Sequence, residues 1–194
     1  MNPETQTRSW SYKMHDSINV PVVGSLAALC IGGIFSLIDT LLVTKIFLAY
    51  IVLDTVWIII FPASIPNTAR FIIFHHLLTF CILLHPLRYP EHSMETCRDG
   101  IVELNTFFLI LRRQLRRGSF FNLFSNLCYN ATLGIRFLWQ PYLIYHFYII
   151  TNVREGYPYS EFLCVLGSQV LLCIFNICLI LRRTKKIPEK NKRI

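Results

Sequence analysis

Residues 71–117 decide the fold of this chain. They begin with an apolar segment that contains a histidine pair, FHHLLT at 74–79. A second apolar segment, VELNTFFL at 102–109, carries Glu103 and is followed by the basic cluster RRQLRR at 112–117. An ionised side chain in the middle of a membrane costs about 2.5–3.5 kcal/mol, so such groups usually face a protein interior or a wet cavity. The arginines indicate the side of the membrane on which their loop lies.

Apolar residues elsewhere in the chain also come in blocks of membrane length. The 194 residues are 54% hydrophobic, and their mean hydropathy is +0.47. Residues 17–38 and 162–181 contain no Asp, Glu, Lys or Arg, and 46–69 contain only Asp54. A helix crosses the hydrocarbon of a bilayer with about 20 residues, whereas a soluble domain shows periodic apolar stripes. The sequence therefore predicts an all-α, polytopic membrane protein with one domain.

Six transmembrane helices are expected, at about 18–38, 42–61, 70–87, 99–111, 118–153 and 161–181. This transmembrane domain, 18–181, lies between a polar tail at 1–17 and a basic tail at 182–194. The segment 118–153 is compatible with one long helix bent near Pro141 or with two short crossings. Two crossings would put the arginine cluster at 112–117 and the basic tail at 182–194 on opposite sides of the membrane, against the positive-inside rule. We therefore favour one long element, with both termini in the cytosol.

The last five residues, KNKRI, predict where the protein resides. Lys190 and Lys192 match the KxKxx form of the dilysine retrieval signal, which is read by the coat machinery and returns membrane proteins to the endoplasmic reticulum. The alternative is a plain basic tail that holds anionic lipid. The formal net charge of +8 does not indicate a nucleic-acid partner, because the basic residues stand at the ends of apolar blocks and not on a soluble face.

Several polar side chains are expected inside the membrane. One interpretation is structural, with pairs such as Arg136 and Glu103 holding helices together. The other is a polar cavity in which one imidazole acts as a general base and a carboxylate orients it. Adjacent residues of an ideal helix point about 100° apart, so only one histidine of the pair is expected to face that cavity. The candidate catalytic residues are His75, His76 and Glu103, and the candidate substrate contacts are Asp54, Thr79, Thr106 and Arg136.

Some chemistries have no matching motif. The sequence contains no HExxH or similar set of metal ligands, so no metal site is predicted. It also has no nucleophile elbow that would present a serine or cysteine.

Together these segments resemble the TLC-domain family, which includes the translocating-chain-associating membrane protein, the ceramide synthases and a neuronal ceroid lipofuscinosis protein. The matching pieces are WSYKMH at 10–15, Asp54, HHLLT at 75–79, ELNTFFLILR at 103–112, Arg136 with Pro141, and Asn176. Two features depart from the family pattern. Phe107 stands where the family has proline, and CRDG at 97–100 stands near the place of the H-D-x-x-D segment of ceramide synthases. The resemblance is therefore to the branch without ceramide synthase activity.

The resemblance implies a ring of six helices around a central, lipid-accessible cavity. It implies a role in lipid homeostasis in the endoplasmic reticulum, either as an acyltransferase that uses an intramembrane histidine and acyl-CoA as co-substrate, or as a non-catalytic protein. The non-catalytic alternatives are a regulator of membrane lipid composition and an adaptor for cargo that leaves the endoplasmic reticulum. The expected partners are membrane lipids and the coat machinery, and no bound cofactor is expected. A channel or transporter is a third class, for which the sequence shows no inverted repeat.

Overall fold

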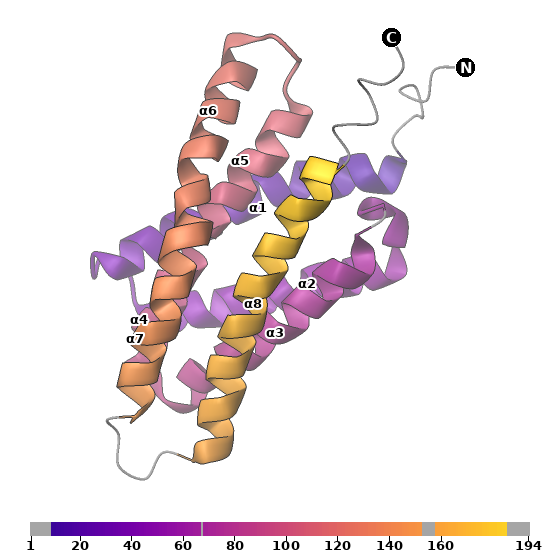
Figure 1. Ribbon diagram of the computed structural model, residues 1–194. Helices are drawn as coiled ribbons and strands as arrows, with labels where there is room; N and C mark the ends of the chain where they lie inside the picture. The colour runs from indigo at the N-terminus through magenta and orange to yellow at the C-terminus, as the bar shows by residue number, and fades with distance from the viewer. Residues whose placement is uncertain (1–8, 67, 153–157, 186–194) are drawn as a thin grey trace.

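The computed structural model describes residues 9–66, 68–152 and 158–185, and these residues form helices and no strand (Figure 1). The prediction of an all-α protein is therefore confirmed. The helices are α1 (Trp10–Ile34), α2 (Thr40–Ile60), α3 (Ala69–Arg88), α4 (Ser93–Gly100), α5 (Glu103–Gln114), α6 (Phe120–Gly134), α7 (Gln140–Asn152) and α8 (Tyr159–Lys185). Short 3₁₀ turns follow α2 and α3, η2 (Pro62–Ser64) and η3 (Pro90–His92), and a π-helix, η4 (Ile135–Trp139), joins α6 to α7.

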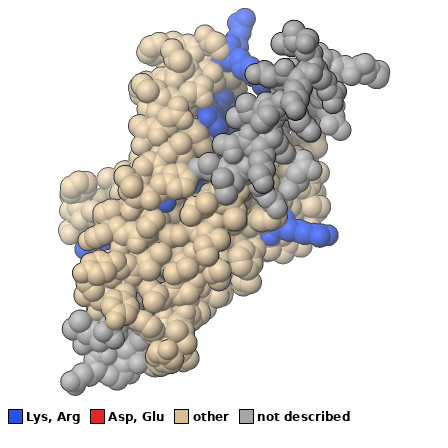
Figure 2. Space-filling model, viewed as in Figure 1, with Lys and Arg blue, Asp and Glu red and all other residues tan. Residues whose placement is uncertain are grey.

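Within the described residues, four helices are long and apolar enough to cross a membrane: Trp10–Ile34, Thr40–Ile60, Ala69–Arg88 and Tyr159–Cys178. Many large apolar side chains point outward, among them Leu53 and Phe120. On the face shown in Figure 2, a few Lys and Arg are visible among the described residues and no Asp or Glu is. A membrane-embedded protein is compatible with these features. Of the other two expected crossings, 99–111 corresponds mainly to the short helix α5, and 118–153 is divided into α6, η4 and α7. The ring of six crossings therefore stays a prediction.

The first helix corrects a predicted boundary. α1 begins at Trp10 and not near residue 18, and the Ser9 side chain caps it by accepting a hydrogen bond from the Tyr12 amide at 3.2 Å. The first two turns bury polar side chains, including His15 and Asp16. Polar residues can be buried when other helices supply hydrogen-bonding partners. A boundary placed where charged residues stop therefore starts this helix too late.

The segment 118–153 forms one continuous helical element from Phe120 to Asn152, as predicted. Its irregular part precedes Pro141. There the Gln140 amide bonds to the carbonyl of Ile135, five residues back, which is the π-helical pattern. Proline lacks an amide proton and disturbs the preceding turn. π-helical turns are frequent at functional sites, and this one carries Arg136.

The helices enclose a polar interior. α1 packs against α2, α4 and α5, α3 packs against α2 and α8, α8 packs against α7, and α6 packs against α5. An apolar cluster that includes Leu26, Phe47 and Leu83 fills the space between α1, α2, α3 and α4. The remaining interior, between α1, α3, α5 and α8, contains the candidate site.

Candidate functional site

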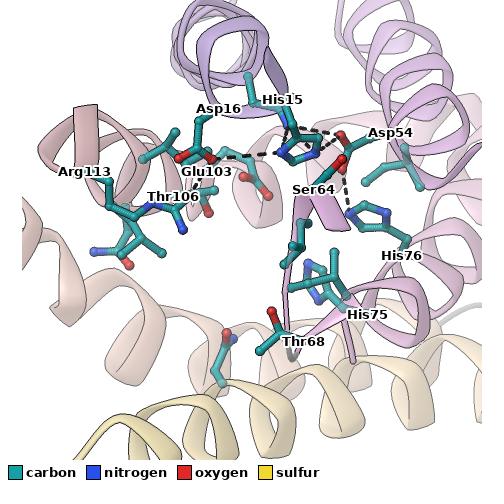
Figure 3. A pocket seen from close by; sticks show the side chains of 18 of the residues that line it. His15, Asp16, Asp54, Ser64, Thr68, His75, His76, Glu103, Thr106 and Arg113 are labelled. Atoms are coloured by element: carbon teal, nitrogen blue, oxygen red, sulfur yellow. Dashed lines mark hydrogen bonds and ion pairs between the residues drawn. The ribbon is translucent and has the colours of Figure 1, made fainter. Parts of the chain in front are cut away.

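A cavity of about 580 Å³ lies between the helices, with walls from α1, α2, α3, α5, α6, η4 and α8 (Figure 3). Its lining is both polar and apolar. The apolar residues are Ile51, Ile65, Ile72, Leu109, Ile110, Leu133 and Phe175. A volume of about 300–1,000 Å³ with a mainly apolar wall and a few convergent polar groups is typical of small-molecule sites.

Asp54 lies at the centre of the polar wall and is buried. Its Oδ1 lies 2.9 Å from His15 Nε2 and accepts a hydrogen bond from Asn19 Nδ2 at 3.1 Å. Its Oδ2 lies 3.6 Å from His76 Nε2. A carboxylate buried in a medium of low polarity needs such partners. Asp54 therefore joins α1, α2 and α3 and is not available only for substrate.

Both histidines of the pair line this cavity, so the prediction that only one would do so is wrong. The side chain of His76 is directed toward α2, where its Nδ1 lies 2.9 Å from Thr55 Oγ1. The side chain of His75 is directed toward α8, and its ring stacks on Phe175 with centroids 4.8 Å apart. α3 lies between α2 and α8, and the two side chains point to either side of the cavity, one toward each of these helices. An offset of about 100° between adjacent residues of a helix accounts for this arrangement.

The two imidazoles differ in the atoms that remain available. Both ring nitrogens of His76 have neighbours, since Thr55 lies at Nδ1 and Asp54 near Nε2. The Nδ1 atom of His75 is buried and has no hydrogen-bond partner among the described residues. Of the two imidazoles, His75 is therefore the one with a ring nitrogen that has no hydrogen-bond partner among the described residues.

Glu103 and Thr106 from α5 and Arg136 from η4 also line this cavity, as the sequence predicted for a shared cavity. Arg136 donates from Nε to Asn105 Oδ1 at 2.7 Å, from one terminal nitrogen to Asn176 Oδ1 at 2.7 Å, and from the other to the Thr106 hydroxyl. These bonds connect η4 to α5 and α8. They also fix the position of the guanidinium group beside the cavity.

Thr79 does not line this cavity, contrary to its expected role as a substrate contact. Its hydroxyl donates to the backbone carbonyl of His75 at 3.0 Å, and the residue lines a separate cavity of about 30 Å³. The reason is the helical rise, because Thr79 lies one turn farther along α3 than His75.

Sequence reasoning missed several polar residues of the cavity, among them Asp16, His15, Asn19 and Arg113. Arg113 donates to Asp16 Oδ1 at 3.0 Å and so connects α5 to the first turns of α1. The sequence pattern marks Arg113 as a topology signal, and it places His15 and Asp16 in the polar tail and Asn19 at the start of the first span. One local signal could have found two of them, because His15 and Asn19 are four residues apart and share a helix face.

Among the described residues, no group of three or more His, Cys, Asp or Glu side chains is arranged to hold a metal ion. Lys190 and Lys192 lie outside the described residues.

Comparison with known proteins adds no relative: no family model, no curated protein and no solved structure matches the chain. The resemblance to the TLC-domain family thus depends on the quoted segments alone and stays a prediction.

Proposed function

We propose that this protein is a multi-pass membrane protein of lipid homeostasis in the endoplasmic reticulum, and that it transfers an acyl group to a lipid with His75 as general base. The observation that carries the proposal is the large cavity of mixed polarity with both histidines and Glu103 on its wall. Its apolar residues suit an acyl chain, and its polar residues suit a reacting head group.

His75 fits the role of base better than His76. A general base needs a ring nitrogen that can reach the proton of the acceptor. Both nitrogens of His76 already have polar neighbours, because Nδ1 lies 2.9 Å from Thr55 Oγ1 and Nε2 lies 3.6 Å from Asp54 Oδ2. Under this proposal, His75 accepts the proton of a lipid hydroxyl or amine while that oxygen or nitrogen attacks the carbonyl of an acyl-CoA thioester. The proton then passes to the departing thiolate, and Glu103 stabilises the imidazolium in between.

Thr106 and Arg136 are assigned to the polar part of the substrate. The Arg136 guanidinium is positioned by Asn105 and Asn176, so it is ordered before any ligand binds. A preorganised cation can stabilise the negative charge that develops on the carbonyl oxygen during acyl transfer.

The test is acyl transfer by the purified full-length protein in lipid nanodiscs, with acyl-CoA and a mixture of amine- and hydroxyl-bearing lipids. Loss of a general base lowers a rate by about 10²–10⁴, so His75→Ala should lose activity by that factor with an unchanged melting temperature. Leu77→Ala is the matched control, because Leu77 is on the same helix and 58% exposed. Wild-type product formation by a folded His75→Ala variant would remove this mechanism.

A non-catalytic role in lipid composition or cargo exit is the alternative, and the network at Asp54 favours it. There His15, Asn19 and His76 connect three helices, which is a structural task. Under this alternative, the His75→Ala variant restores the lipid composition of cells that lack the protein as well as the wild type does.

Residence in the endoplasmic reticulum is proposed to depend on Lys190 and Lys192. Changing both to serine should move the protein to later compartments, as seen by fluorescence microscopy, while Lys185→Ser and Lys186→Ser together should not. Unchanged localisation of the first double variant would show that the tail is not the signal.

A further inference from the structure

Carboxylates and imidazoles follow one another along the polar interior. At the end where α1 begins, His15 Nδ1 lies 4.0 Å from Asp16 Oδ1, and His15 Nε2 lies 2.9 Å from Asp54. Asp54 Oδ2 is 3.6 Å from His76, whose ring centroid is 5.8 Å from that of His75. All five side chains line the main cavity, which has room for water between them (Figure 3).

The series continues through the smaller cavity. His75 and Glu103 line both cavities, so they form part of the wall between the two. Asp99 stands on the wall of the smaller one. A water molecule needs about 10–15 Å³ of such space, and this cavity has about 30 Å³, enough for one or two. A water molecule in this cavity would have His75, Glu103 and Asp99 on its wall.

From Asp99 the series reaches the opposite end of the molecule. Asp99 accepts hydrogen bonds from Gln169 at 3.0 Å and Gln140 at 3.5 Å. Glu95 is four residues earlier on α4, and therefore lies on the same helix face one turn away. Its Oε2 lies 3.2 Å from His146 Nε2, and the His146 side chain is 25% exposed. Arg98 contacts both Glu95 and His146 and so closes this end of the series.

We infer that this protein conducts protons across the membrane along this series. Chains of Asp, Glu and His inside membrane proteins are the usual groups of proton relays. Stabilisation by helix contacts alone does not explain why titratable side chains occur along the whole series, because interhelical polar contacts in membranes average only about 0.6 kcal/mol. A proton binds at Asp16 or His15, passes between successive side chains and cavity water, and leaves at Glu95 or His146. Each hop returns the donor to its unprotonated form, so the net result is one proton moved and no group consumed.

Proton conduction needs no acyl donor, so it can be tested independently of acyl transfer. The test is proton flux into liposomes that contain the purified full-length protein and a pH-sensitive dye, driven by a potassium gradient with valinomycin. Wild-type liposomes should acidify faster than protein-free ones. Asp99→Asn should lower that flux to the protein-free rate, because an amide cannot pass a proton on. Glu103→Gln should lower it less, because His75 also borders the cavity that contains Asp99. Glu161→Gln should leave it unchanged, because Glu161 pairs with Arg88 outside the series.

Two further measurements keep the result interpretable if a variant unfolds. A hydrophobic carbodiimide, which modifies buried carboxyl groups, should abolish wild-type flux, and Asp99→Glu should retain it. Flux no faster than in protein-free liposomes would overturn the inference. Wild-type flux in folded Asp99→Asn protein, or in carbodiimide-treated protein, would also overturn it.

Discussion

At the scale of single residues, the side chain of Asp54 contacts polar side chains from two other helices. Its carboxylate lies within hydrogen-bond distance of two side chains of α1 and within 3.6 Å of His76. An ionic group buried with partners is strongly destabilising when one member is removed, because the others are left buried without compensation. The effect of changing this residue should therefore be on the fold first and on any activity second.

Asp54→Ala should lower the stability of the protein by about 1–3 kcal/mol, the cost of leaving a buried partner unsatisfied. Asp54→Asn keeps an oxygen acceptor and should lose less. Thermal unfolding of the detergent-solubilised protein measures both. Leu53→Ala, at a neighbouring position that is 70% exposed, is the control. Equal melting temperatures for wild type and Asp54→Ala would contradict this role.

At the scale of elements, α1 and α4 pack closely through two glycines. A Cβ atom at Gly33 would lie 2.4 Å from Cys97 Sγ, and one at Gly100 would lie 2.5 Å from Cys30 Sγ. Both cysteines are fully buried and their side chains are short, so neither sulfur can move far. Each glycine therefore accepts the sulfur of the facing helix, which is the role of small residues at membrane helix contacts.

Gly33→Ala should destabilise the protein by about 1–3 kcal/mol through overpacking. Adding Cys97→Ala should recover most of the loss, because it removes the sulfur in the way. Gly167→Ala is the control: no atom lies within 4 Å of its Cβ position, and alanine is the better helix former. Chemical or thermal unfolding of the four proteins decides the matter, and a double variant as unstable as Gly33→Ala would exclude this contact as the cause.

The π-helix η4 is the second element whose effect can be tested. Arg136→Ala leaves the buried side chains of Asn105 and Asn176 without their donor and should destabilise the protein by about 1–3 kcal/mol. Leu138→Ala changes the same turn at a position that is 76% exposed and should have a smaller effect. Comparable losses in the two variants would show that the turn itself, and not the arginine, carries the stability.

At the scale of the whole molecule, the start of α1 and the end of α8 lie at the same end, together with the loop that joins α5 to α6 (Figure 1). The turn between α1 and α2 lies at the opposite end, and Phe35 and Leu37 in it are 70% and 78% exposed. Basic residues cluster at the first of these ends, which the positive-inside rule assigns to the cytosol.

A glycosylation acceptor fused after Ile194 should therefore remain unmodified in the endoplasmic reticulum, and one inserted after Ser36 should be glycosylated. A shift in gel mobility that is reversed by an endoglycosidase measures each. Modification of the first acceptor and not of the second would reverse the topology.

Hydrophobicity acts locally and adds up along the chain, so the sequence by itself determined the helical class, the apolar helices and the single element at 118–153. It also placed Glu103, Arg136 and one of the two histidines at one cavity, whereas the structure places both histidines there. It misplaced the start of α1, because His15 is buried only through Asp54, 39 residues away, and Asp16 through Arg113, 97 residues away. Such pairings depend on which helices meet, and only the tertiary structure decides that. For the same reason, the different surroundings of His75 and His76 and the π-helical turn at Arg136 could not be deduced from their identity or spacing.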